Sequence, residues 1–322
     1  MLVSVCNSGN HSLLSFWTRT KIACGYCLVV VDPLCVRAPE DGEPRLTARW
    51  HAECWYNWDT TPGWLSELGY DVMEFNMPLL GPNNNGSIGT RSHEWFGGWE
   101  KQGVKVMRFF VEPVSLAINF ALTQGYERFV MVGLSGGGWS TTVASALDKR
   151  IGLSFPVAGS VPFGMRSNSW HDGGDFEQER GRAIYGACDY ECMYTLAGLE
   201  EGRMQVQLLH EADSCCFRSG PRHPAIVKYN QQVAQRLAAA AAAQNGSGTM
   251  CTVATAGNVH EVCTLLLMTA GAVFEPKPAA QVNMRDKAVI AYLIDRYDHG
   301  GGSALPHAVE CPHLPFNVLY RW

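Results

Sequence analysis

The sequence predicts an α/β fold, in which a mainly parallel, doubly wound sheet is covered by helices on both faces. From about residue 69 onward, short apolar segments alternate with amphipathic helical ones, which is typical of this class. The 322 residues are 47% hydrophobic and 17% charged, a composition that suits a globular protein with a large core. A glycine-rich turn at residues 133–137 joins one expected strand to the helix that follows it.

The expected elements follow one another regularly after an ambiguous start. Residues 1–44 form an irregular segment, in which residues 22–31 could be one strand. Residues 45–52, which follow this segment, could be another strand. Pro78 ends the first strand of the regular part and opens a loop rich in glycine, proline and asparagine. We expect further strands at residues 69–78, 128–133, 151–161, 204–210 and 249–255, and helices at residues 63–68, 109–124, 138–147, 224–244 and 284–297.

Two segments depart from this alternation. Residues 163–200 hold aromatic side chains among many polar ones, and an insertion of this length is often a lid or a pocket wall. Residues 298–322 carry glycines and prolines without a clear period, and we expect a C-terminal tail there. The predicted domain therefore covers residues 45–297.

The turn at residues 133–137 has the pattern Gly-x-Ser-x-Gly, with Ser135 at its centre. A serine on a sharp strand-to-helix turn has a strained backbone and exposes its hydroxyl over the end of the sheet. Gly133 and Gly137 lack side chains, so the neighbouring strand and helix can approach closely. The amide of Gly136 falls at the N-terminus of the expected helix, where it can bind a developing oxyanion. An ordinary serine in a glycine-rich turn is the alternative interpretation.

A serine nucleophile needs a general base and a carboxylate that orients this base. Asp213 lies three residues beyond the expected strand 204–210, and His260 lies in the loop after the expected strand 249–255. In a parallel sheet, the loops that follow the strands meet at one edge, where such folds have their sites. We therefore predict a catalytic triad of Ser135, Asp213 and His260.

These motifs resemble those of the α/β-hydrolases over residues 45–297. Residues 133–137 match the nucleophile elbow, and Asp213 and His260 match the acid and histidine loops after the seventh and eighth strands. Residues 69–81 resemble the fourth strand of the family and its continuation. The resemblance implies a sheet of the α/β-hydrolase type with an insertion after the sixth strand. It also implies hydrolysis of a carboxylic ester or related acyl bond through an acyl-enzyme, without a cofactor or a metal.

One stretch departs from the family pattern. The family usually has His-Gly or a glycine-rich run after its third strand, which supplies the second amide of the oxyanion hole. The equivalent residues 50–57 contain no glycine, so an amide near Glu53 or Cys54 would have to serve. Losing one oxyanion donor costs about 10²–10³ in turnover. A non-catalytic binding protein on a hydrolase scaffold therefore remains an alternative, as does a peptidase or thioesterase with the same triad.

Other acids and histidines compete for the triad roles. Asp213 could be a surface acid, and its substitutes are then Glu211 and Asp189. His260 could be a histidine of an ordinary turn. His210 falls within an expected strand, which favours a buried, hydrogen-bonded side chain.

Several residues with metal-binding side chains have no role in this interpretation. His51 and His93 can face the pocket, but nothing in the sequence assigns them a function. For the acidic run over residues 172–179, a solvated face is favoured over a calcium site. The four acids of this run are Asp172, Asp175, Glu177 and Glu179.

The twelve cysteines allow disulfides without fixing a pattern. Cys24 and Cys27 form a CxxC motif, which leads into a strand-like apolar run and so argues against a redox or zinc site. Cys188 and Cys192 are spaced to lie one helical turn apart, and the two cysteines at 215–216 follow Asp213 directly.

Charge and hydropathy limit the partners. The net charge is −5, and the absence of a basic patch argues against binding of nucleic acid. No apolar run reaches the roughly 18 residues that a membrane-spanning helix needs. The partner that we expect is a small-molecule acyl substrate, while the compartment and the oligomeric state stay open.

Overall fold

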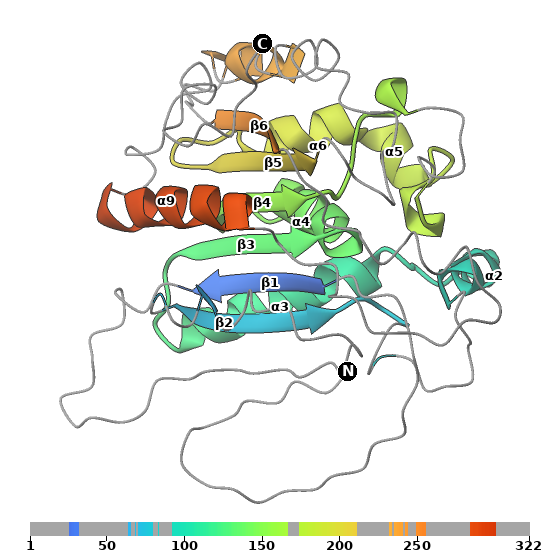
Figure 1. Ribbon diagram of the computed structural model, residues 1–322. Coiled ribbons are helices and arrows are strands. Elements are labelled where there is room, and N and C mark those ends of the chain that lie inside the picture. Colours follow the sequence, from blue (N-terminus) through green and yellow to red (C-terminus); the bar gives the residue numbers. More distant parts are fainter. Residues whose placement is uncertain are drawn as a thin grey trace, which may run out of the picture.

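The chain has α/β architecture, with one sheet and helices on both of its sides (Figure 1). In this computed structural model, the described residues are 26–31, 64–65, 68, 70–79, 83, 92–166, 174–210, 232–233, 235–240, 242–243, 249–255 and 284–300. The predicted residues Asp213 and His260, the segment 32–63 and residues 301–322 therefore lie outside the described part. The tail predicted from residue 298 starts too early, because the helix Met284–Gly300 includes its first three residues.

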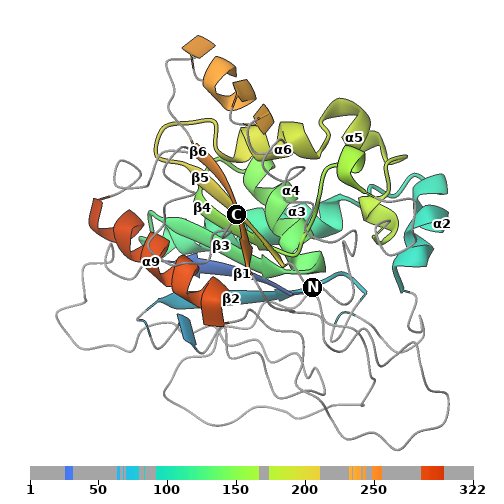
Figure 2. The ribbon, with the colours of Figure 1, turned by 45° about the horizontal axis from the view of Figure 1, so that its top comes forward.

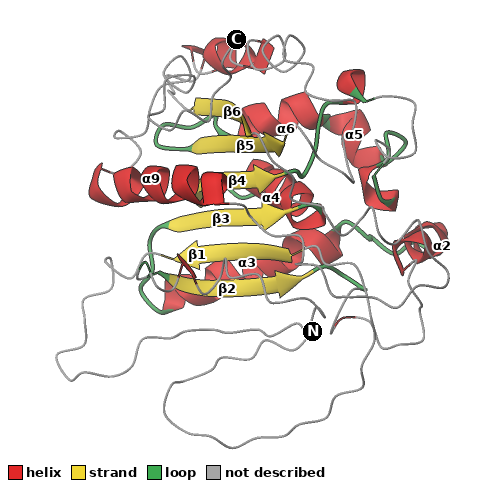
Figure 3. Ribbon diagram, viewed as in Figure 1, coloured by secondary structure: helices red, strands yellow, loops and turns green. Residues whose placement is uncertain are grey.

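The described strands form one six-stranded sheet in the order β2-β1-β3-β4-β5-β6 (Figure 3). Strands β3 to β6 pair in parallel, as predicted, whereas β1 is antiparallel to both of its neighbours. The strands are β1 (Tyr26–Val31), β2 (Asp71–Asn76), β3 (Phe129–Leu134), β4 (Ile151–Val157), β5 (Met204–His210) and β6 (Thr249–Thr255).

Most helices connect or cover these strands, and no helix of the described residues is long and apolar enough to cross a membrane. Helical residues also occur between 232 and 243. The α-helices are α2 (Trp95–Lys101), α3 (Arg108–Thr123), α4 (Gly136–Leu147), α5 (Ala183–Ala187), α6 (Tyr190–Ala197) and α9 (Met284–Gly300). The short 3₁₀ helices are η3 (Ser92–Glu94), η4 (Phe163–Met165) and η6 (Phe176–Gln178).

Both faces of the central strands β3, β4 and β5 are buried, which explains the nearly continuous apolar runs of β3 and β4. The side chains of alternate residues of β3 point to opposite faces of the sheet. Val130 and Val132 pack in one cluster with Leu293 of α9, and Phe129 and Met131 pack in another with residues of α3. Helix α9 therefore covers one face, while α3 and α4 cover the other (Figure 2).

A third apolar cluster fills the space between α4 and the segment 174–200. Tyr185, Tyr190 and Tyr194 are buried there, together with Trp139 of α4. These three tyrosines of the predicted insertion are thus core residues, and the helices α5 and α6 are packed against the body of the protein.

The expected strand at 151–161 is too long, because β4 ends at Val157. Ala158 has φ 47°, a left-handed conformation that a strand cannot contain. The sequence gives no sign of this bend, since alanine rarely adopts a positive φ. The expected strands at 204–210 and 249–255 are confirmed with the same bounds.

Candidate active site

Ser135 stands at the turn between the end of β3 at Leu134 and the start of α4 at Gly136. Its backbone has φ 62° and ψ −118°, and its side chain is half-buried. A non-glycine residue in such a sparsely populated conformation costs about 1–3 kcal/mol, which the surrounding structure must offset. The Ser135 amide donates to Val157 O at 2.9 Å, and Ser135 O accepts from Trp139 N at 2.9 Å. Strand β4 and helix α4 therefore hold the strained residue from both sides.

Glycines make the turn tight enough for this arrangement. A Cβ atom on Gly133 would collide with Gly137 O and Thr141 Oγ1 of the following helix. A Cβ atom on Gly138 would lie 2.6 Å from Val157 O and 2.8 Å from Gly159 Cα. Helix α4 can therefore approach β3 and β4 closely only because these positions are glycines, as predicted for Gly133.

The first turn of α4 offers backbone donors beside the serine. The first four N–H groups of a helix have no partner within it, and the amide of Gly136 is the first of these in α4. The side chain of Met77 lies against this residue, since a Cβ on Gly136 would be 2.9 Å from Met77 Cε. Ser140 Oγ donates to Met77 Sδ at 3.4 Å and fixes this contact.

Met77 directly follows β2, so the loop after that strand reaches the serine turn. The sequence reasoning missed Met77, although it lies in the stretch 69–81 that resembles the fourth strand of the hydrolase family. The expected oxyanion donors near Glu53 and Cys54 lie outside the described residues. Strand β1 presents its first residue at this edge, because Tyr26 pairs with Leu134.

The structure brings the strand ends that precede Asp213 and His260 to the edge of the sheet that carries Ser135. Strands β5 and β6 run parallel to β4, which runs parallel to β3. His210 ends β5 and Thr255 ends β6, and these two residues pair with each other. Asp213 and His260 themselves lie three and five residues further on, outside the described part, and their roles remain predictions.

His210 has a structural role in the described part of the chain. Its side chain is fully buried, and its Nε2 lies 2.7 Å from Oδ2 of Asp286 near the start of α9. The expectation of a buried, hydrogen-bonded histidine is therefore confirmed. This pair joins the end of β5 to α9.

Asp189 also has a structural task, which removes it from the list of substitutes for Asp213. It is the N-cap of α6, where its Oδ1 accepts a hydrogen bond from Cys192 N at 2.9 Å. Cys188 and Cys192 form a disulfide in the same turn. Their expected closeness is confirmed, and the bond reinforces the cap.

A second polar cluster lies between η3 and η6. His93 is 7% exposed, and its Nδ1 lies 3.1 Å from Oε1 of Glu177, whose side chain is 0% exposed. The expectation that the acidic run forms a solvated face is therefore wrong for Glu177, although Asp175 and Glu179 are exposed as expected. A partner 84 residues away explains the burial, and local sequence carries no signal for it.

Hydrogen bonds link this cluster to the serine turn. Trp139 Nε1 donates to Tyr185 Oη at 2.8 Å, and Tyr185 Oη donates to the carbonyl oxygen of Glu177 at 2.8 Å. Burial raises the pKa of Tyr185, so that its hydroxyl stays neutral and can accept and donate at once. Helix α4 and the backbone of the buried Glu177 therefore share one polar network.

The arrangement can present a nucleophile and an oxyanion donor at one edge of a parallel sheet. No protein-family model, curated protein or solved structure matches this chain. The chemistry of the site is therefore inferred from its own residues and backbone geometry.

Proposed function

We propose that this chain is a serine hydrolase of the α/β-hydrolase type, which cleaves a carboxylic ester or a related acyl bond. The observation that carries the proposal is the backbone of Ser135, with φ 62° and ψ −118° between a buried strand and a buried helix. Strain of this kind at an exposed strand end is typical of the nucleophile elbow. Two backbone hydrogen bonds hold Ser135 in this conformation, and glycines let the neighbouring backbone approach closely. An ordinary serine in a turn would need neither.

The proposed reaction has two steps. Ser135 Oγ attacks the acyl carbon while His260 takes its proton, and His260 then gives this proton to the leaving alcohol. Water hydrolyses the acyl-enzyme by the same route and restores the serine. Asp213 orients His260 and stabilises its imidazolium, and the amide of Gly136 stabilises the oxyanion of each tetrahedral intermediate. These assignments make no use of a cofactor.

The test is labelling with a fluorophosphonate, which reacts only with an activated serine. We expect one adduct on the peptide that contains Ser135, located by mass spectrometry, and none in Ser135→Ala. His260→Ala should lose the adduct as well, because the base that activates the serine is gone. His223→Ala is the matched control, since it removes a histidine outside the triad. We also expect ester turnover in Ser135→Ala to fall by about 10³-fold or more.

A pair of acid variants tests the third member of the triad. Asp213→Asn should lower ester turnover by about 10²–10⁴-fold, because the histidine loses its orienting carboxylate. Glu211→Gln removes an acid two residues away and should leave turnover nearly unchanged. The reverse result would transfer the role to Glu211. Folded protein without any adduct would contradict the hydrolase and favour a binding protein on the same scaffold.

A further inference from the structure

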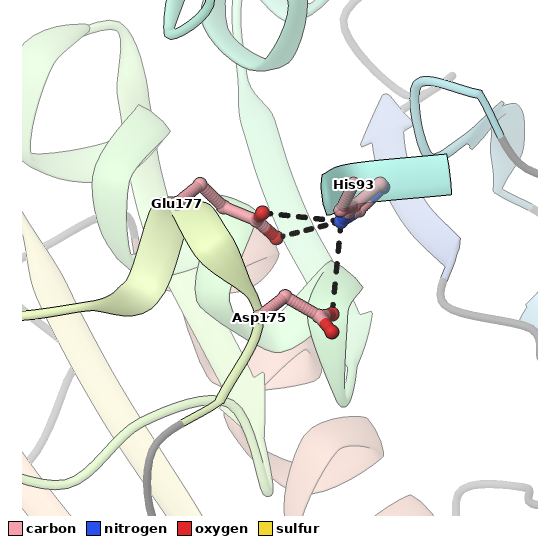
Figure 4. A group of neighbouring side chains, drawn as sticks. All are labelled: His93, Asp175 and Glu177. Carbon is pink, nitrogen blue, oxygen red and sulfur yellow. Dashed lines mark hydrogen bonds and ion pairs between the residues drawn. The ribbon is translucent and has the colours of Figure 1, made fainter. Parts of the chain in front are cut away.

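A histidine and two carboxylates meet outside the proposed catalytic site (Figure 4). His93 comes from η3, Glu177 from η6, and Asp175 is the N-cap residue of η6. His93 Nδ1 lies 3.1 Å from both carboxylate oxygens of Glu177 and 3.7 Å from Oδ2 of Asp175. One ligand atom from each residue lies within 4.8 Å of the others.

The other nitrogen of His93 fixes the tautomer of the ring. Nε2 lies 2.9 Å from the carbonyl oxygen of Pro78, and a carbonyl oxygen only accepts hydrogen bonds. Nε2 therefore carries the proton, and the lone pair of the neutral ring on Nδ1 points at two carboxylates. Electron-rich atoms at these distances repel one another unless a cation lies between them. That cation is a proton, carried by Nδ1 or by one of the carboxylates, or it is a metal ion.

A single proton leaves the cluster incompletely satisfied. A proton on Nδ1 serves Oε1 of Glu177, but Oε2 makes no hydrogen bond with any residue of the described part, although its side chain is 0% exposed. One proton is then shared by two oxygens at the same distance from Nδ1, and a buried carboxylate oxygen without a hydrogen bond of its own costs free energy. Two carboxylates beside one imidazole ring also give the cluster more acidic groups than basic ones, which favours binding of a cation.

We propose that His93, Asp175 and Glu177 bind a divalent transition-metal ion of the zinc type. Metal–ligand bonds of about 2.0–2.1 Å in a tetrahedral site place neighbouring ligand atoms roughly 3.3–3.4 Å apart. The distances of 3.1 Å and 3.7 Å from His93 Nδ1 to the two carboxylates lie close to this value. Imidazole nitrogen suits zinc and its neighbours, whereas calcium and magnesium prefer ligand sets made of oxygen. Asp175 is 58% exposed, so the ion can enter from solvent and complete its coordination with water.

The surroundings hold the histidine ready for a ligand. The hydrogen bond to Pro78 orients the ring, as backbone carbonyls do for metal-binding histidines in general. The ring also packs against Phe96 at 4.9 Å and against the edge of Phe110 at 5.8 Å, which hinders it from turning away. A bound ion would tie η3 to η6 across 84 residues and hold the segment 174–200 on α2 and α3.

The experiment uses the full chain, stripped with a chelator, dialysed and titrated with Zn²⁺ alone in a calorimeter. We expect one Zn²⁺ ion per chain, with affinity at least about 10-fold weaker in Asp175→Asn and Glu177→Gln. Glu179→Gln is the matched control, because it removes an exposed acid of the same run. The wild type and this control should also show a rise in melting temperature with Zn²⁺, and Asp175→Asn should show a smaller one.

Titration with Co²⁺ distinguishes this cluster from a site on cysteines. A strong thiolate charge-transfer band in the absorption spectrum would place the ion on cysteines and overturn the proposal. Equal affinity in the wild type, Asp175→Asn and Glu177→Gln would overturn it too. Asp175→Asn decides the matter if Glu177→Gln fails to fold, since an exposed side chain contributes little to stability. Ser135→Ala should bind Zn²⁺ like the wild type, so the outcome is independent of the proposed hydrolase activity.

Discussion

The serine turn and the His93 cluster place polar groups in unusual positions by opposite means. The serine turn is built from residues 129–159, in which β3, α4 and β4 follow one another and the close contacts between backbone atoms are local. The His93 cluster joins residues that lie 84 positions apart in the sequence. The first depends on missing side chains, and the second depends on polar side chains that the fold brings together.

The difference explains how each region should respond to mutation. Glycine contacts in the turn are between backbone atoms, which cannot move aside without shifting a strand or a helix. The side chains of the His93 cluster, in contrast, can be replaced by neutral side chains of similar shape. Damage to the turn should therefore appear as lost stability, and damage to the cluster as lost binding.

The largest effect is expected for Gly133→Ala. The added methyl group meets the backbone of Gly137, so α4 must move away from β3, at a cost of about 3 kcal/mol or more in the free energy of unfolding. Urea denaturation measures this loss. Gly98→Ala is the control, because a Cβ there meets nothing within 4 Å. In the interior of α2 it should stabilise the protein by up to about 1 kcal/mol. Equal stability of the two variants would refute the tight packing of the turn.

An intermediate effect, dependent on pH, is expected at the far end of α4. Asp148 accepts hydrogen bonds from Arg150 Nε at 2.8 Å and from Ser115 Oγ at 3.1 Å. Burial would raise the pKa of Asp148, but the hydrogen bonds and charge of Arg150 outweigh it, so the pKa is lowered. A lowered pKa in the folded state gives stability that is present above the unfolded pKa of about 3.9 and is lost as pH falls.

Asp148→Asn should therefore lower the free energy of unfolding at pH 7 by about 1–2 kcal/mol. The difference from the wild type should shrink below about pH 4, where the wild-type carboxylate is protonated as well. Chemical denaturation of both proteins from pH 7 to pH 3 gives the two curves. A difference that stays constant with pH would mean that the aspartate acts by shape and not by charge.

The smallest effect is the coupling between the two regions. Trp139→Phe and Tyr185→Phe each remove one side of the hydrogen bond that joins α4 to the segment 174–200. We expect a double-mutant cycle, measured by urea denaturation, to give an interaction energy of about 0.5–1.5 kcal/mol. A coupling energy of zero would show that the serine turn and the cluster are energetically independent.

Structural features that depend on neighbouring residues alone could be predicted well from the sequence. Strands β5 and β6 carry an apolar residue at every second position or more often, and glycine or charged residues flank them in the sequence, so their limits could be predicted to the residue. The serine turn has a strict pattern because Gly133 and Gly138 leave room for neighbouring backbone atoms. The early end of β4 could not be predicted, since Ala158 takes its positive φ from the surrounding packing and not from its own preference.

Long-range relations could not be predicted in the same way. The run of valines in β1 indicates a strand, but nothing in it specifies that the strand lies beside β3 in the antiparallel direction. The acids of residues 172–179 look alike in the sequence, and only the fold selects Glu177 for burial beside His93. Met77 contacts the serine turn through tertiary packing alone.

The hydrogen bond from the Ser135 amide to Val157 has a consequence for the motions of this region. Catalytic loops often exchange their amide protons rapidly, because they open without disturbing the core. The amide of Ser135 donates a hydrogen bond to the last residue of β4, which is a buried central strand. Its proton can therefore exchange only when β3 and β4 separate. Its exchange with deuterium should be as slow as that of the core strands. The proposed nucleophile would then be carried by one of the last parts of the protein to unfold.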